Sequence, residues 1–213
     1  MQLTSSGGVI VGSDEALARA QRSFAQDHLV RLPRFLDPEV LTLVDRALAE
    51  AVFVPRIHAG IAHESCMTAN PMLSLLHFAL NDTRLYRTVE RVTGCDAIGC
   101  FTGRVFRLTP DTDDYDSWHN DVVGHRLIGL TVNLTNRPYQ GGILQMREDR
   151  SGRICAEVAN VVPGDAVLFR IAEGLAHRVT PVTGTVPRVT FAGWFHSEPD
   201  FAALLANPEA FDL

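Results

Sequence analysis

Two histidines and an aspartate have the types and spacing needed to hold a metal ion. They occur as His119-Asn120-Asp121 and, further along, as His177. Residues two apart on an extended strand point to the same side, so His119 and Asp121 can reach one ion. A histidine from a distant strand can supply the third ligand. Two imidazoles and one carboxylate on one face of an octahedron leave three positions open, which suits Fe(II), O2 and a chelating co-substrate.

A histidine and an aspartate two positions apart are weak evidence for a metal site by themselves. With 8 His and 25 acidic residues in the chain, such a pair can arise by chance. The surrounding motifs strengthen the prediction. Gly141-Gly142-Ile143-Leu144 and the Pro-Gly-Asp turn within Val162–Phe169 lie between the two histidines. Arg188 and Thr190 follow His177, and they share one face of a predicted strand.

In this order, the motifs resemble those of the 2-oxoglutarate/Fe(II)-dependent oxygenases, most closely their prolyl-4-hydroxylase-like branch. That family has a His-x-Asp pair, a Gly-Gly-x-Leu segment, a Pro-Gly-Asp or Pro-Gly-Ser turn, a distal His and a later basic residue. The likeness covers about residues 97–196 and extends more weakly to Leu29–Leu36.

The resemblance implies roles for individual residues. His119, Asp121 and His177 would be the iron ligands, and Arg188 would bind the distal carboxylate of 2-oxoglutarate with the help of Thr190. The chain departs from the family at Asn133, which stands where the pattern has a Tyr that also binds the co-substrate. Asn133, with Thr131, is expected to donate a hydrogen bond instead. Leu144 matches a position that lines the co-substrate site in the family. Trp194 matches an aromatic residue that the family places near iron, and the alternative is that it simply packs in the core.

The implied cofactor is Fe(II), and the implied co-substrates are 2-oxoglutarate and O2. The expected reaction hydroxylates or otherwise oxidises an unactivated C–H bond and releases succinate and CO2. Asp121 favours oxidation, because halogenating relatives carry a small residue at that position. One alternative is a cupin-like metalloprotein that does not use 2-oxoglutarate and has no need of Arg188. The other is a non-enzymatic binding protein.

Composition limits the class of partner. A net charge of −6 in 213 residues argues against binding nucleic acid or an anionic membrane. No apolar run is long enough to span a bilayer, and residues 1–12 lack the pattern of a secretory signal. Four cysteines without a Cys-x-x-Cys pair indicate reduced thiols in a cytoplasmic protein. We expect a small-molecule substrate, with a peptide as the alternative; the oligomeric state cannot be told.

The predicted fold is mainly β with packed N-terminal helices, a double-stranded β-helix or jelly roll. One domain is expected over residues 1–213, its helical half (about 13–93) packing on a jelly-roll core (about 97–196). Capping residues and apolar spacing predict helices over Asp14–Gln26, from Pro38, over Pro71–Leu80 and over Thr83–Val92. The stretches Val52–Asn70 and Asp111–Asp116 are expected to be loops, the second one solvated. The predicted strands are Ala97–Leu108, Leu127–Leu134, Ile143–Arg147, Ala166–Arg170, His177–Val179 and Arg188–Phe195.

Overall fold

Helices dominate the N-terminal part of the chain. The computed structural model describes residues 1–5 and 9–198. Within these ranges the helices are α1 (Asp14–Asp27), α2 (Pro38–Ala49), α3 (Pro71–Leu80) and α4 (Thr83–Thr93). Each begins after a side chain that accepts a hydrogen bond from a backbone N–H of the first turn, and these caps are Ser13, Asp37, Asn70 and Asp82. The four predicted helices are therefore confirmed to within one or two residues.

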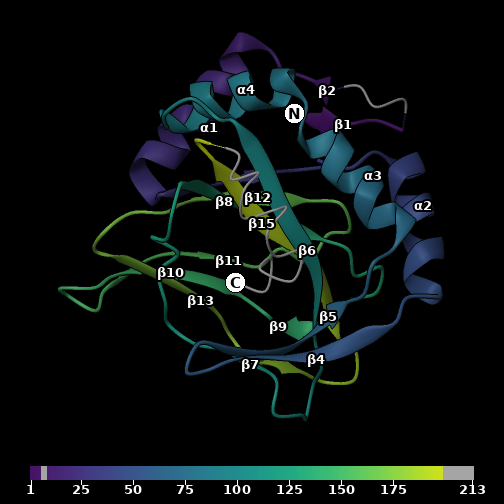
Figure 1. Ribbon diagram of the computed structural model, residues 1–213. Coiled ribbons are helices and arrows are strands. Elements are labelled where there is room, and N and C mark those ends of the chain that lie inside the picture. Colours follow the sequence, from purple (N-terminus) through teal and green to yellow (C-terminus); the bar gives the residue numbers. More distant parts are fainter. Residues whose placement is uncertain (6–8, 199–213) are drawn as a thin grey trace.

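A large antiparallel sheet forms the body of the protein (Figure 1). Among the described residues its order is β3-β12-β8-β15-β6-β5-β4, and β7 pairs with β5. Its strands are β3 (Leu29–Leu32), β4 (Phe53–His58), β5 (Ala62–Met67), β6 (Cys100–Leu108), β7 (Tyr115–Asp116), β8 (Arg126–Asn133), β12 (Ala166–Arg170) and β15 (Arg188–His196).

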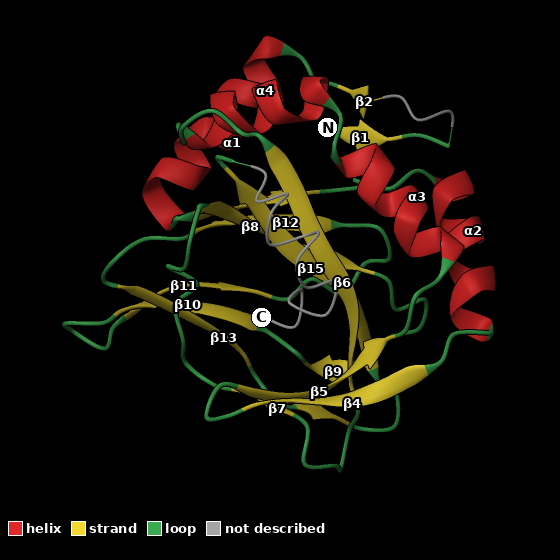
Figure 2. Cartoon of the chain, viewed as in Figure 1, coloured by secondary structure: helices red, strands yellow, loops and turns green. Residues whose placement is uncertain are grey.

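A smaller sheet completes the jelly roll. It consists of β11-β10-β13, and Figure 2 shows it below the helix-covered part of the large sheet. The remaining strands form two short pairs, β1 with β2 and β9 with β14. The bounds of these strands are β1 (Gln2–Leu3), β2 (Val9–Ile10), β9 (Gln140–Gly141), β10 (Leu144–Glu148), β11 (Ile154–Val158), β13 (Leu175–Val179) and β14 (Val182–Thr183).

Two apolar cores fix the relation between these layers. The larger one joins the helices to the outer face of the large sheet, and Phe191 and Phe195 of β15 belong to it. The smaller core includes Met146 of β10 and Val167 of β12, so it lies between the two sheets. Because side chains alternate along a strand, Arg188, Thr190, Ala192 and Trp194 of β15 lie on the opposite face and point into the space enclosed by the sheets.

The Pro-Gly-Asp turn has a structural explanation. Asp165 is 3% exposed, accepts a hydrogen bond from Arg34 N at 2.8 Å and pairs with Arg31 Nη2 at 3.1 Å. Its carboxylate thereby ties the segment after β3 to the start of β12. The motif that the sequence analysis placed between the two histidines anchors the N-terminal part of the chain to the jelly roll.

The prediction of a loop over Val52–Asn70 was wrong. This segment contains a β-hairpin in which β4 and β5 pair from Phe53↔Met67 to His58↔Ala62. Gly60 sits in its turn with a φ of 76°, a conformation that glycine adopts without steric cost. The hairpin extends the large sheet through β5, which pairs with β6 at Cys66↔Phe106.

None of the helices within the described ranges is long and apolar enough to cross a bilayer. Cys66, Cys95, Cys100 and Cys155 are all free in the same part of the chain.

Candidate active site

The two histidines of the predicted metal site are paired through their backbones. His119 lies in an extended segment between β7 and β8 and forms an isolated antiparallel bridge with His177 of β13. His119 N donates to His177 O at 3.0 Å, and His177 N donates to His119 O at 2.8 Å. The imidazole rings are 4.3 Å apart between centroids. A single bridge therefore brings together two side chains that are far apart in the sequence.

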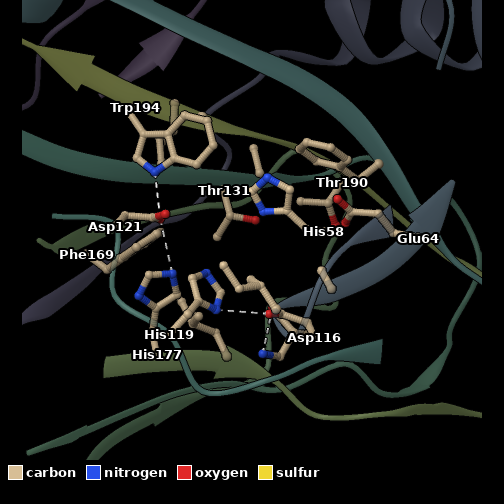
Figure 3. Close-up of a pocket in the computed structure, with 18 of the residues that line it drawn as sticks. His58, Glu64, Asp116, His119, Asp121, Thr131, Phe169, His177, Thr190 and Trp194 are labelled. Atoms are coloured by element: carbon tan, nitrogen blue, oxygen red, sulfur yellow. Dashed lines mark hydrogen bonds and ion pairs between the residues drawn. The ribbon is translucent and has the colours of Figure 1, made fainter. Parts of the chain in front are cut away.

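Asp121 completes a cluster of three possible metal ligands. One ligand atom from each of His119, Asp121 and His177 lies within 4.8 Å of the others. His177 Nε2 is 3.3 Å from Asp121 Oδ2, and a dashed line in Figure 3 marks this interaction. His119 Nδ1 lies 2.7 Å from the carbonyl oxygen of Ser117, a suitable acceptor for a proton on this nitrogen. That arrangement leaves the Nε2 lone pair of His119 for a metal ion.

Neighbouring side chains orient the carboxylate of Asp121. Trp194 Nε1 donates to Oδ2 at 2.7 Å, and Arg126 Nη1 donates to Oδ1 at 3.0 Å. The Arg126 guanidinium also stacks on the Trp194 ring, 3.7 Å from its centroid. Trp194, for which the sequence left core packing open, thus contacts the predicted ligand directly.

The electrostatics of the cluster favour an ionised Asp121. Burial by itself would raise the pKa of this carboxyl group, but the hydrogen bonds and charges of His177, His119 and Trp194 hold the pKa well below its usual range. An ionised carboxylate beside two imidazoles is the donor set that the sequence analysis expected for Fe(II).

The predicted co-substrate residues lie in the same cavity. Arg188 and Thr190, at the start of β15, are 6% and 2% exposed, and both line the cavity. Arg188 Nε and Thr190 Oγ1 are buried atoms without a hydrogen-bond partner in the described structure. Arg188 Nη2 reaches Thr131 Oγ1 only at 3.5 Å. Buried donors normally have partners, so these groups fit a carboxylate of a bound ligand.

The Gly-Gly segment leaves space for the Arg188 side chain. A Cβ at Gly142 would lie 2.7 Å from Arg188 Cδ, and one at Gly141 would lie 2.0 Å from the carbonyl oxygen of Pro181. Both glycines also have positive φ. Any larger residue would therefore push the Arg188 side chain or the backbone away, which accounts for the motif in physical terms.

Asn133 lies apart from the residues that enclose the cavity. It is opposite Thr190 in the register of β8 and β15, but the lining residue of β8 nearest to Arg188 is Thr131. Asn133 Oδ1 accepts a hydrogen bond from Thr135 N at 3.0 Å, and its Nδ2 has no partner among the described residues. Leu144 lines the cavity, as the sequence suggested.

The expected solvated loop before His119 is only partly solvated. Asp111 is exposed, but Tyr115 and Asp116 form β7. Asp116 accepts a hydrogen bond from Val179 N at 2.9 Å and lies 3.3 Å from His119 Nδ1. Burial raises the pKa of Asp116. The end of this segment is therefore part of the site and supports His119.

The unpredicted hairpin supplies the opposite wall. Arg56 and His58 of β4 and Glu64 of β5 line the cavity, whose volume is about 200 Å³. Figure 3 places His58 and Glu64 across the cavity from the cluster of His119, Asp121 and His177. The signal that could have found them is the two-residue spacing of Arg56 and His58, which puts both on one face of a strand.

Comparison with known proteins agrees with this geometry. Residues 104–196 match the model of a family described as the 2OG-Fe(II) oxygenase superfamily. This range contains the three predicted metal ligands and both predicted carboxylate-binding residues. No curated protein gives a significant sequence match to the chain.

Solved structures share the fold at low sequence identity. A prolyl-4-hydroxylase from Pseudomonas putida is 20% identical, with a TM-score of 0.63 over 84% of this chain and 98% of that one. A Trichoplax adhaerens prolyl hydroxylase, in complex with a hypoxia-inducible-factor peptide, is 15% identical, with a TM-score of 0.62 over 88% and 94%. The α-ketoglutarate-dependent epimerase SnoN from nogalamycin biosynthesis is 15% identical, with a TM-score of 0.61 over 86% and 84%. These likenesses establish the jelly-roll fold.

Proposed function

We propose that this protein, whose residues 104–196 match the 2OG-Fe(II) oxygenase family model, is a 2-oxoglutarate-dependent dioxygenase that oxidises an unactivated C–H bond of a small molecule. An amino acid or a natural-product intermediate is the kind of substrate we infer. Hydroxylation is the expected outcome, with succinate and CO2 released.

One observation carries the proposal. The ligand atoms of His119, Asp121 and His177 lie within 4.8 Å of one another, in the same cavity as the unpaired buried donors of Arg188 and Thr190. A metal site alone would fit many jelly-roll proteins, and a buried arginine alone would fit many others. Their combination in one cavity supports a metal ion and a carboxylate-bearing co-substrate bound together.

The protein positions the reactants and excludes water. His119, Asp121 and His177 would hold Fe(II), while Trp194 and Arg126 fix the carboxylate of Asp121. Bound Fe(II) and 2-oxoglutarate, with O2, supply the oxidising power of the reaction.

Arg188 and Thr190 would fix the far end of 2-oxoglutarate by hydrogen bonds to its distal carboxylate. Leu144 and Phe169 give this end of the cavity apolar walls, which keep the reacting atoms away from bulk water.

A prolyl residue in a peptide is the second candidate substrate. It is favoured by the two prolyl hydroxylases among the solved structures of the same fold, one of them in complex with a peptide. SnoN, named for nogalamycin biosynthesis, supports a small molecule instead. We prefer the small molecule because the cavity beside the predicted metal ligands has a volume of only about 200 Å³ and the sequence carries no basic stripe.

The test is formation of succinate from 2-oxoglutarate. The protein is loaded with Fe(II) without oxygen and then exposed to O2, and succinate is measured for the wild type, His119→Ala and the control His125→Ala. His125 is an exposed histidine outside the cavity lining. We expect slow turnover in the wild type and the control, and background levels in His119→Ala. Equal succinate from His119→Ala and the wild type would contradict the proposed metal site.

A further inference from the structure

Glu64 is a buried carboxyl group in the cavity that none of the steps above uses. It lies on β5 of the hairpin, and only 16% of its side chain is exposed. Its ion-pair partner is Arg56, with 3.6 Å between Arg56 Nη1 and Glu64 Oε1, too long for a hydrogen bond. Arg56 Nη2 is itself buried and lacks a hydrogen-bond partner among the described residues. Arg56 and Glu64 therefore form an ion pair without a hydrogen bond, which is unusual for buried charges.

The strand register places Glu64 in the same row as Arg188. Ser65 is opposite Arg107 in the β5–β6 pairing, so the next position puts Glu64 beside Leu108. Leu108 is in turn opposite Arg188 of β15. All three side chains line the cavity. Glu64 is thus separated from the predicted carboxylate-binding arginine by one apolar side chain.

The charges around Glu64 oppose one another. Burial raises the pKa of Glu64 to about 7; the positive charges of Arg56 and Arg188 lower the pKa, and the negative charges of Asp116 and Asp114 raise it. These charged residues belong to four parts of the chain: Arg56 to β4, Asp116 to β7, Arg188 to β15 and Asp114 to the segment before β7. The neighbouring residue of β6 is the uncharged Leu108. At neutral pH, protonated and ionised Glu64 are both populated.

Occupation of Arg188 changes this balance. A carboxylate bound to the Arg188 guanidinium cancels the positive field that favours the ionised form of Glu64. It also adds a like charge on the Glu64 side of the cavity. Both effects favour the neutral carboxylic acid, so a ligand carboxylate at Arg188 and a proton on Glu64 stabilise each other.

We propose that Glu64 belongs to the co-substrate site and acts there as a neutral acid: binding of 2-oxoglutarate at Arg188 is coupled to uptake of one proton by Glu64. The inference rests on the proposed function and adds to it a positioning residue on the hairpin. No bond is broken in this step; the proton comes from solvent and leaves again when 2-oxoglutarate departs. The alternative is that Glu64 stays ionised as the permanent counter-charge of Arg56, which predicts no proton uptake.

The test is calorimetric titration of 2-oxoglutarate into protein loaded with Mn(II), a metal that holds the site without turnover, between pH 6.0 and 8.5. Both carboxyl groups of 2-oxoglutarate are ionised over this range, so the ligand adds no titration of its own. We expect the affinity of the wild type to fall as pH rises above about 7, approaching ten-fold per pH unit. Glu64→Gln, which is always neutral, should bind with nearly constant affinity and exceed the wild type at pH 8.5.

Proton uptake is measured in the wild type itself, from the dependence of the binding heat on the ionisation enthalpy of the buffer. A net uptake of protons, less than one per bound ligand, is expected near neutral pH, because ligand binding shifts Glu64 from the ionised towards the neutral form. This readout needs no variant, so it stands even if Glu64→Gln fails to fold. Glu173→Gln, which changes an exposed glutamate outside the cavity, is the matched control and should behave as the wild type.

The outcomes separate the two proposals. Binding with constant affinity and no proton uptake in the wild type, or a Glu64→Gln variant with the same pH slope, would overturn the role of Glu64 and leave the proposed function intact. Absence of binding at every pH, together with absence of His119-dependent succinate, would overturn the proposed function itself.

Discussion

The indole of Trp194 links the predicted metal cluster to the large sheet through one hydrogen bond. Trp194→Phe keeps the ring packing and removes only the N–H that Asp121 Oδ2 accepts. Loss of such a supporting bond typically weakens metal binding ten-fold or more. We expect the dissociation constant for Fe(II), measured anaerobically by calorimetry, to rise about ten-fold.

Trp118→Phe is the control for this experiment. The guanidinium groups of Arg147 and Arg178 stack on the Trp118 ring, and Trp118 is not among the residues that line the cavity. If both variants lost the same affinity, the effect would be general loosening of the protein, and the hydrogen bond to Asp121 would have no special importance.

Arg188 should be irreplaceable by another cation. Arg188→Lys keeps the charge but loses the planar fork that can bind a carboxylate through two parallel hydrogen bonds. We expect the affinity for 2-oxoglutarate to fall at least about ten-fold, roughly 1.4 kcal/mol, with the affinity for Fe(II) unchanged. Arg178→Lys is the matched control, because Arg178 donates a hydrogen bond to Gln145 of β10 and does not line the cavity. Unchanged 2-oxoglutarate binding in Arg188→Lys would remove Arg188 from the site.

At the scale of residues, the predicted sites differ in how visible they are in the sequence. His119, Asp121 and His177 could be chosen because their types and spacing are those of a known ligand set, and the structure brings them together. Glu64 could not, because a single glutamate has no motif. Its position in the cavity depends on a strand pairing between β5 and β6 that no local pattern encodes.

At the scale of elements, β6 and β15 approach each other closely at a pair of glycines, Gly103 and Gly193, which are directly opposite each other. A Cβ at Gly193 would lie 2.1 Å from Thr102 O and 2.5 Å from Gly103 Cα. Gly193→Ala must therefore separate the two central strands, at a cost on the order of 3 kcal/mol. Chemical denaturation should show this loss of unfolding free energy.

The control for Gly193→Ala is Gly12→Ala. A Cβ at Gly12 would meet the Ala16 Cβ at 3.4 Å, which is an ordinary contact. Its effect on the unfolding free energy should stay within about 0.5 kcal/mol. A Gly193→Ala protein as stable as the control would mean that the β6–β15 pair tolerates separation.

The elements that were predicted well carry local signals, and those that were missed do not. The helices begin at capping residues, and the confirmed strands are apolar runs between turn residues. The hairpin β4–β5 was missed because Pro55 interrupts its first strand and its cavity face is charged, with Arg56 and Glu64 among its residues. Those side chains are stabilised by the cavity, which forms only when the sheet is complete.

At the scale of the whole molecule, buried histidines make stability depend on pH. Burial and the charges of Arg126 and His125 lower the pKa of His196 to about 4, against about 6.5 in an unfolded chain. Between pH 6.5 and 4 the unfolded chain therefore binds a proton that the folded protein does not, so stability falls as pH falls through this window. We expect the unfolding free energy to decrease over this range in the wild type.

His196→Gln should flatten this dependence. Glutamine does not titrate and can keep a hydrogen bond to Thr102, the partner of His196 at 2.9 Å. Glu173→Gln, which changes an exposed residue that does not contribute to the lowered pKa of His196, is the control and should follow the wild type. An equally steep fall in His196→Gln would assign the pH dependence to other groups, such as His77, whose pKa is also lowered by burial.

The backbone bridge between His119 and His177 has a consequence for the protein without metal. The two amide protons are each held by the partner residue's carbonyl, independently of any ion. Chelation of the metal should therefore leave the fold intact, and hydrogen exchange at these two amides should stay as slow after chelator treatment as before it. Fast exchange only in the chelated sample would mean that the ion assembles the bridge. Slow exchange in both samples would make this protein a rigid receptor that can lose its metal and take it up again without refolding.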